Sequence, residues 1–281
     1  MSLAPAIAPS GWEASLHLTF RRDGERTVLG RRTSVGPLAV QKALYPEGQQ
    51  VCHAIVLHPP GGIAGGDQLD ISVGIESGGH ALLTTPGATK WYRSTGAESS
   101  QRIGLRLASQ AVCEWMPQEN IFFEAARARN ALTVDLAEGA VFCGWDVMCL
   151  GRTASGERFR SGSICQQWRV ERLGKPLFEE RCVLEGGSAL LGSPIGMAGF
   201  PVCATLMVAG SGSDRAALDA CRAIVPAEAC KWGVTLMDDV LVARCLSHSA
   251  QVAREYFLAL WRLLRPNYAR IPASVPRIWA T

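Results

Sequence analysis

A strict alternation of apolar and polar residues over 69–75 (Leu-Asp-Ile-Ser-Val-Gly-Ile) predicts a β-strand with one buried face. The segment before it, 58–67, reads His-Pro-Pro-Gly-Gly-Ile-Ala-Gly-Gly-Asp, and the segment after it, 84–94, reads Thr-Thr-Pro-Gly-Ala-Thr-Lys-Trp-Tyr-Arg-Ser. Proline restricts the backbone and glycine permits conformations closed to other residues, so both segments are typical of well-defined loops. Two rigid loops joined by strands can hold polar groups in fixed positions, and we expect the function to lie here.

Short strands are predicted along most of the chain, from Leu16 to about Met207. Asp23-Gly24 is typical of a hairpin turn, and Leu173-Gly174-Lys175-Pro176 of a second turn. The expected strands cover residues 16–20, 27–29, 69–75, 132–136, 164–170, 177–184 and 202–208. Strands of this length, separated by glycine and proline, favour an all-β sandwich, a barrel or a coil of sheets.

The C-terminal third has a different pattern, which predicts two α-helices. Ser213 is expected to cap a first helix that Pro226 ends, and Ser249 a second helix that Pro266 ends. Between the helices, 236–246 is expected to form a strand. The apolar faces would consist of Ala217, Leu218, Cys221, Ile224 and Val225, and of Val252, Tyr256, Leu260 and Leu263. We therefore predict one mainly-β domain, residues 1–281, with two α-helices in its C-terminal third.

Composition limits the class of protein. The chain has 281 residues, of which 48% are apolar and 19% charged, and this is enough to bury a sizeable core. A net charge of +3 with scattered Lys and Arg argues against nucleic acid as a partner. The first residues lack the basic end and apolar stretch of a signal peptide, so a cytoplasmic protein is expected.

One uncharged stretch, between Glu185 and Asp214, is long enough to cross a bilayer. Pro194, Pro201 and several glycines interrupt it, and they would leave backbone groups unpaired in lipid. A buried loop followed by a strand is therefore expected, and no contact with a membrane.

The ten cysteines fit no metal or disulfide pattern. No Cys-x-x-Cys pair occurs, and the spacings match no zinc site. Because free cysteine packs as a small apolar residue, reduced thiols in the core are the expectation.

Known catalytic and nucleotide-binding motifs are absent from the sequence. The loop Gly-Gly-Ile-Ala-Gly-Gly over 61–66 matches neither Gly-x-Gly-x-x-Gly nor a Walker motif, and positive φ angles at several of its positions are expected instead. There is no Gly-x-Ser-x-Gly elbow. The five histidines form no short metal-binding pair.

Acidic residues remain as candidates for function. Asp67 ends the glycine loop, while Glu119, Asp146, Glu157 and the Glu179-Glu180 pair lie in or near other turns. Taken singly, each is expected to be a turn residue, an acceptor for backbone N–H groups or an arginine partner. Together, carboxylates and hydroxyls along a channel could pass a divalent cation without holding it, because oxygen ligands bind such metals less tightly than His or Cys.

Several segments carry a resemblance to a known family. They are His58–Asp67, Thr84–Ser94, Trp115–Glu119, Gly144–Glu157 and the apolar end Pro276–Thr281, and in this order they resemble the urease accessory protein D family, called H in some bacteria. The resemblance covers nearly the whole chain. The family often has a basic residue where this chain has Gln68, and a glycine expected before Pro276 is missing.

The resemblance implies a scaffold for urease maturation and not an enzyme. Members bind the F accessory protein, which recruits the GTPase G, and they contact apo-urease, so that Ni²⁺ reaches the buried urease site with its carbamylated lysine. The resemblance also implies a mainly-β, helical or barrel-like stack of sheets with two helices and an internal tunnel for nickel. No tightly bound cofactor is expected. Ni²⁺ would be transient, and GTP would be bound by the partner.

The residues proposed for a transient nickel path are Asp67, Thr84, Asp146, Glu157 and Glu180. Two alternatives stay open at this point. One is a metal-dependent hydrolase using Asp67, Asp146 and His58, although its motif is missing. The other is a pure adaptor through which nickel does not pass.

Overall fold

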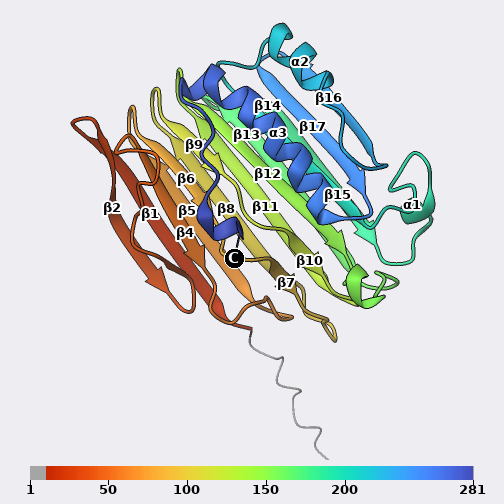
Figure 1. Ribbon diagram of the computed structural model, residues 1–281. Coiled ribbons are helices and arrows are strands. Elements are labelled where there is room, and N and C mark those ends of the chain that lie inside the picture. The colour runs from red at the N-terminus through yellow and green to blue at the C-terminus, as the bar shows by residue number, and fades with distance from the viewer. Residues whose placement is uncertain (1–10, 281) are drawn as a thin grey trace, which may run out of the picture.

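The computed structural model describes residues 11–280, which form two β-sheets and a small number of helices (Figure 1). One sheet has seven strands in the order β14-β13-β11-β8-β5-β1-β2. Its strands are β1 (Glu13–Asp23), β2 (Arg26–Val35), β5 (Gln68–Ile75), β8 (Ser99–Leu107), β11 (Arg127–Leu136), β13 (Ser163–Arg172) and β14 (Lys175–Glu185).

The second sheet has ten strands, eight of them in the order β16-β17-β15-β12-β9-β6-β4-β3. These are β3 (Ala39–Val40), β4 (Val51–Leu57), β6 (His80–Thr84), β9 (Val112–Trp115), β12 (Val141–Leu150), β15 (Val202–Ala209), β16 (Lys231–Met237) and β17 (Val240–Ser247). The other two are β10 (Asn120–Phe122), which pairs with β12, and β7 (Thr89–Trp91), which pairs with β10.

The chain alternates between the two sheets as it advances. β4, β6, β9 and β12 are parallel neighbours in one sheet, and β5, β8, β11 and β13, which lie between or after them in sequence, are parallel neighbours in the other. Antiparallel strands extend both sheets at their ends. This arrangement confirms the predicted mainly-β, helical stack.

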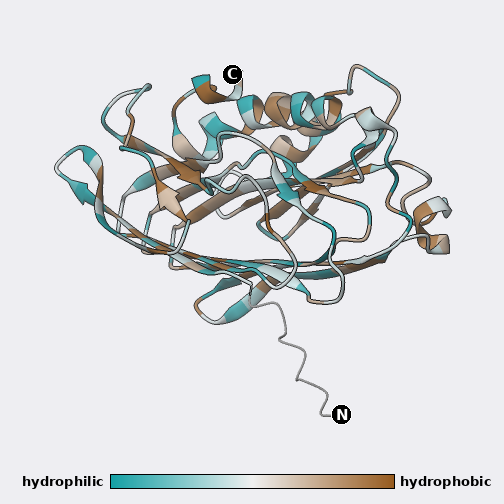
Figure 2. Cartoon of the chain, turned by 90° about the horizontal axis from the view of Figure 1, so that it is seen from below, coloured by the Kyte–Doolittle hydropathy of each residue, from teal (hydrophilic) through white to brown (hydrophobic). Residues whose placement is uncertain are grey.

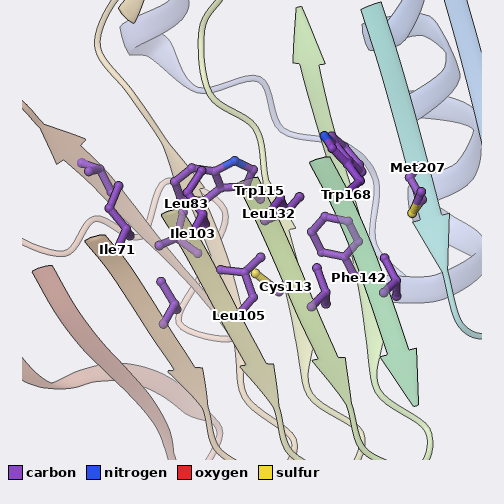
Figure 3. Close-up of a cluster of buried hydrophobic side chains, with 14 of the residues drawn as sticks. Ile71, Leu83, Ile103, Leu105, Cys113, Trp115, Leu132, Phe142, Trp168 and Met207 are labelled. Atoms are coloured by element: carbon purple, nitrogen blue, oxygen red, sulfur yellow. The ribbon is translucent and has the colours of Figure 1, made fainter. Parts of the chain in front are cut away.

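The space between the sheets holds the larger core, and its side chains come from matching positions of successive strands (Figure 3). Ile71 of β5 is opposite Ile103 of β8, which is opposite Leu132 of β11, and Leu132 is opposite Trp168 of β13. Because side chains in a strand alternate between faces, one strict alternation repeated in register yields one continuous apolar layer.

A second core lies on the other side of the ten-stranded sheet. The long helix α3 (Ala250–Ala269) packs there against β12, β15 and β17, and α2 (Arg215–Arg222) packs against β16. Figure 2 shows the long helix outside the two sheet layers. All ten residues of β12 are buried, because both faces of that strand are covered. A continuous apolar strand is the expected result of burial on both faces.

Several details of the C-terminal third differ from the sequence-based expectations. Asp214, and not Ser213, caps α2, since its Oδ1 accepts a hydrogen bond from the Ala217 N–H at 2.8 Å. Residues 236–246 are not one strand but the end of β16, a turn at Asp238 (φ 50°) and most of β17. A further single-turn helix, α1 (Ala189–Gly192), lies in the uncharged stretch.

Pro266 lies inside α3 and does not end it, because the helix continues to Ala269 and stops at Arg270 in the left-handed conformation (φ 58°). A proline inside a helix costs about 3 kcal/mol in an isolated helix. Leu264, Arg265 and Tyr268 around it are buried against the sheet, and their packing offsets this cost. No helix within residues 11–280 is long and apolar enough to cross a membrane.

Candidate functional site

A cavity of about 300 Å³ lies between the two sheets, at the end where the two Pro/Gly loops meet. Its apolar walls are the aligned side chains of Ile71, Ile103, Leu132 and Trp168. The loop 85–90 and the glycines of the first loop border it. Its polar lining comes from His58, Thr85, Thr89, Lys90, Gln101, Asn120, Asn130 and Asp146.

The two loops are held against each other by glycine. A side chain at Gly62 would place its Cβ 2.4 Å from the Tyr92 ring, and one at Gly65 would lie 2.5 Å from Ser94 Oγ. Gly61 and Gly66 have the positive φ angles predicted for this loop, 76° and 94°. Positive φ therefore explains two of the four glycines, and close approach of the second loop explains the others.

Asp146 is the carboxylate of the cavity. It lies on β12, whose even-numbered side chains Phe142 and Met148 belong to the core between the sheets. Its Oδ1 accepts a hydrogen bond from Asn120 Nδ2 at 2.6 Å, and its Oδ2 accepts one from the Gln166 amide of the opposite sheet. Burial raises the pKa of Asp146, and the two amides only partly oppose this shift.

His58 brings an uncommitted nitrogen to the same cavity. Its Nε2 is buried and has no hydrogen-bond partner among residues 11–280. Burial lowers the pKa of His58, while the negative charge of Asp67 acts in the opposite direction. The lowered pKa favours the neutral ring, which is the form of histidine that binds metals.

The other predicted path residues are not gathered at the cavity. Asp67 accepts hydrogen bonds from the Trp12 and Ala64 N–H groups, both at 2.8 Å, and so ties the first loop to the start of β1. Thr84 donates to the Met116 carbonyl at 2.6 Å and accepts from Trp279 Nε1 at 2.8 Å, on the helix side of the sheet.

Glu157 and Glu180 are arginine partners. Glu157 accepts three hydrogen bonds from Arg152, at 2.9–3.0 Å, in a surface loop. Glu180 pairs with Arg244 of the ten-stranded sheet, with one contact at 3.1 Å. Of the five predicted residues, only Asp146 lines the cavity. In the described part of the chain, no three His, Cys, Asp or Glu side chains come close enough to hold a metal ion.

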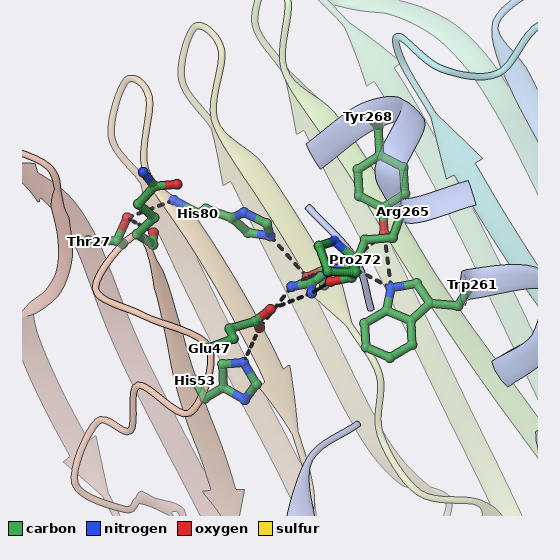
Figure 4. A network of polar contacts seen from close by, with 10 residues as sticks. Thr27, Glu47, His53, His80, Trp261, Arg265, Tyr268 and Pro272 are labelled. Atoms are coloured by element: carbon green, nitrogen blue, oxygen red, sulfur yellow. Dashed lines mark hydrogen bonds and ion pairs between the residues drawn. The ribbon is translucent and has the colours of Figure 1, made fainter. Parts of the chain in front are cut away.

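A buried charged network was missed in the sequence analysis (Figure 4). Glu114 of β9 is fully buried and accepts hydrogen bonds from Arg265 at 2.8–3.2 Å and from Tyr268 at 2.6 Å. His80 contacts the same carboxylate at 2.9 Å. Arg265 also donates to Glu47 at 2.9 Å and to the Pro272 carbonyl at 2.7 Å.

This network connects α3 and the following segment to the sheet. Burial opposes ionisation of Glu114 and Glu47, but hydrogen bonds and charges from histidine and Arg265 lower the pKa of both. The sequence signal was available, because Glu114 interrupts the apolar run Val112-Cys113-Glu114-Trp115-Met116. Every carboxylate oxygen already has a donor, so we interpret the network as structural.

Comparison with known proteins shows the family of this chain. A family model described as UreD urease accessory protein matches residues 13–280. The chain belongs to this family. A urease accessory protein UreD from Azoarcus sp. (strain BH72) is 52% identical over 274 residues, covering 98% of this chain and 96% of that protein. A protein of the same name from Dechloromonas aromatica (strain RCB) is 51% identical, covering 99% and 97%.

Membership in the family gives the chain a role in urease maturation, as an accessory protein and not as an enzyme. The hydrolase alternative built on Asp67, Asp146 and His58 loses its basis with this result. The geometry agrees, because both oxygens of the Asp67 carboxylate are occupied by backbone N–H groups.

Proposed function

We propose that this chain is a cytoplasmic scaffold of urease maturation that binds the F accessory protein and apo-urease. The GTPase G would join the assembly through F, and GTP would be bound by G. The assembly would assist GTP-dependent insertion of Ni²⁺ into urease. The family model and the closely similar UreD relatives support the accessory role. The absence of a nucleotide-binding motif from the sequence is consistent with GTP binding by a partner.

Within this role, we propose that Ni²⁺ passes through the cavity between the sheets. The observation that carries this proposal is the position of Asp146, a buried carboxylate inside a mostly apolar cavity. One carboxylate, Asp146, and one histidine, His58, line the cavity. These are too few ligands to retain a metal ion, so the cavity suits transfer better than storage. The charge of a passing cation would also favour the ionised form of Asp146, which burial disfavours.

The other four predicted residues would need to exchange existing contacts for metal. Asp67 would release two backbone N–H groups, Thr84 would release Trp279, and Glu157 and Glu180 would release arginines. We therefore rank Asp146 first in the proposed path, and these four after it.

The test is urease activation by purified F, G, this chain and apo-urease, with nickel, bicarbonate and GTP. Asp146→Ala should still assemble with its partners but should reduce activation tenfold or more. Asp135→Ala, which removes an exposed carboxylate on the outer face of β11, is the matched control and should activate normally. Full activation by Asp146→Ala would support the pure adaptor instead. A wild-type chain that binds no partner and has no effect on activation would refute the scaffold role.

A further inference from the structure

An apolar groove of about 440 Å³ lies at the end of the molecule farthest from β2. There the last strands of the two sheets, β14 and β16, each have one neighbour only. Cys182 and Leu184 of β14 line one side of the groove, and Cys203 and Leu246 of the ten-stranded sheet line the other. These positions continue the inward-facing rows of the main core.

The loop around α1 adds exposed apolar side chains to this groove. Leu190, which is 41% exposed, and Ile195, which is 95% exposed, line it beside the buried Met197. The loop belongs to the uncharged stretch between Glu185 and Asp214. Contiguous apolar surface of this kind is typical of a site where another protein binds.

The charges at the groove favour an acidic partner. Lys231 borders the groove and has no ion-pair partner among residues 11–280. Arg244, the other basic residue of the lining, is already neutralised by Glu180. An acidic group of a partner could therefore form an ion pair with Lys231.

The form of the groove favours a helix over an added strand. Four separate segments supply its walls, namely β14, the α1 loop, β15 with β17, and β16. Side chains from all four segments line it, whereas strand addition depends on main-chain hydrogen bonds to one edge. A helix inserts apolar side chains spaced three and four residues apart into such a groove.

We propose that this groove binds an amphipathic helix of a partner protein, with apolar side chains in the groove and an acidic residue against Lys231. The inference rests on the proposed scaffold function, because a scaffold must have a surface for its partners. Ile195 would be its central anchor, and Lys231 its charged edge.

Two substitutions test the proposal without disturbing the fold, because both side chains are exposed. Ile195→Asp should weaken binding about tenfold or more, since a charge would replace an apolar anchor. Lys231→Glu should weaken binding about threefold to tenfold, with a larger effect at low salt. The matched controls are Val35→Asp on β2, where the side chain is 66% exposed, and Lys42→Glu in an exposed segment.

The probes are purified F accessory protein and purified apo-urease, measured separately by biolayer interferometry. Weaker binding of either probe to both groove variants, with normal binding to both controls, would support the proposal. If the wild-type chain activates urease and both groove variants bind both probes normally, the groove is not the docking site and the scaffold function stands. If the wild-type chain binds neither probe and does not activate urease, both proposals are wrong.

Discussion

Two buried carboxylates in this protein have opposite pKa shifts, and their neighbours explain the difference. Asp146 is surrounded by neutral amides, which cannot balance its charge, so burial raises its pKa. Glu114 is equally buried, but Arg265 and His80 contact it and lower its pKa. Charge on the neighbouring groups, and not burial alone, decides whether a carboxylate stabilises the fold at neutral pH.

We expect Asp146→Asn to stabilise the protein by about 1 kcal/mol at pH 7. Since the folded-state pKa of Asp146 is raised, the free energy of unfolding falls as the pH rises above the pKa of Asp146 in the unfolded chain. The variant has no carboxyl group at this position and does not lose this stability. The Gln166 Oε1 has no partner among residues 11–280, so rotation of that amide would let the new Asn donate to it. Urea unfolding at pH 7 and at pH 3.5 checks this. The gain should shrink at the lower pH, and a pH-independent difference would contradict the explanation.

Glu114→Gln should have the opposite effect, a loss of about 3–5 kcal/mol, because it leaves Arg265 buried with a reduced negative partner. Because the pKa of Glu114 is lowered by folding, its ionised form stabilises the protein fully at a pH above the pKa of Glu114 in the unfolded chain. This stabilisation is lost as the pH falls through the pKa of Glu114 in the folded protein. The loss in the variant should therefore shrink in acid. Glu157→Gln, at a surface ion pair, is the matched control and should change the free energy of unfolding by about 1 kcal/mol or less.

At the scale of elements, Trp279 attaches the C-terminal segment η2 (Arg277–Ala280) to the sheet. The Trp279 ring lies 5.3 Å from that of Trp145 and 6.1 Å from that of Trp261, and its N–H donates to Thr84. The segment therefore covers one side of the core next to α3.

Trp279→Ala should lower the free energy of unfolding by about 2 kcal/mol, less than a fully buried tryptophan would, because Trp279 is only partly buried. Trp12→Ala is the matched control, since that side chain is 56% exposed, and it should have a small effect. Chemical denaturation monitored by circular dichroism measures both. Equal losses in the two variants would show that Trp279 does not hold the segment in place.

At the scale of the whole molecule, the ten cysteines are free thiols, and nine of them pack in one or the other of the two cores. Seven are buried, and Cys182, Cys203 and Cys230 are partly exposed. Burial raises the pKa of the Cys149 thiol to about 12. Buried thiols of this kind react slowly with disulfide reagents, because the thiolate is the reactive form.

We therefore expect no more than the three partly exposed cysteines to react rapidly with Ellman's reagent in the native protein. All ten should react in guanidinium chloride, without prior reduction. Fewer than ten reactive thiols after unfolding would reveal a disulfide and contradict the reduced state.

Local pattern predicted much of the architecture. The alternating segment 69–75 lies in β5, and Asp23-Gly24 lies in the turn between β1 and β2. Residues 202–208 form nearly all of β15. Such segments are predictable because the alternation of side chains in a strand and the backbone preferences of turn residues depend only on residues close in sequence. Pro266 was mispredicted, since packing of the surrounding helix residues overrides the local cost of proline.

The sequence by itself determined that this chain forms short strands, rigid glycine loops and two late helices, and its motifs identified the family. Only the tertiary structure decided that Asp146 faces a cavity while Asp67 and Thr84 bind other parts of the chain. It also decided that Glu114 meets Arg265, 151 residues away. The physical reason is that the local sequence determines which side chains share one face of a strand. What that face packs against depends on how the strands of the two sheets stack.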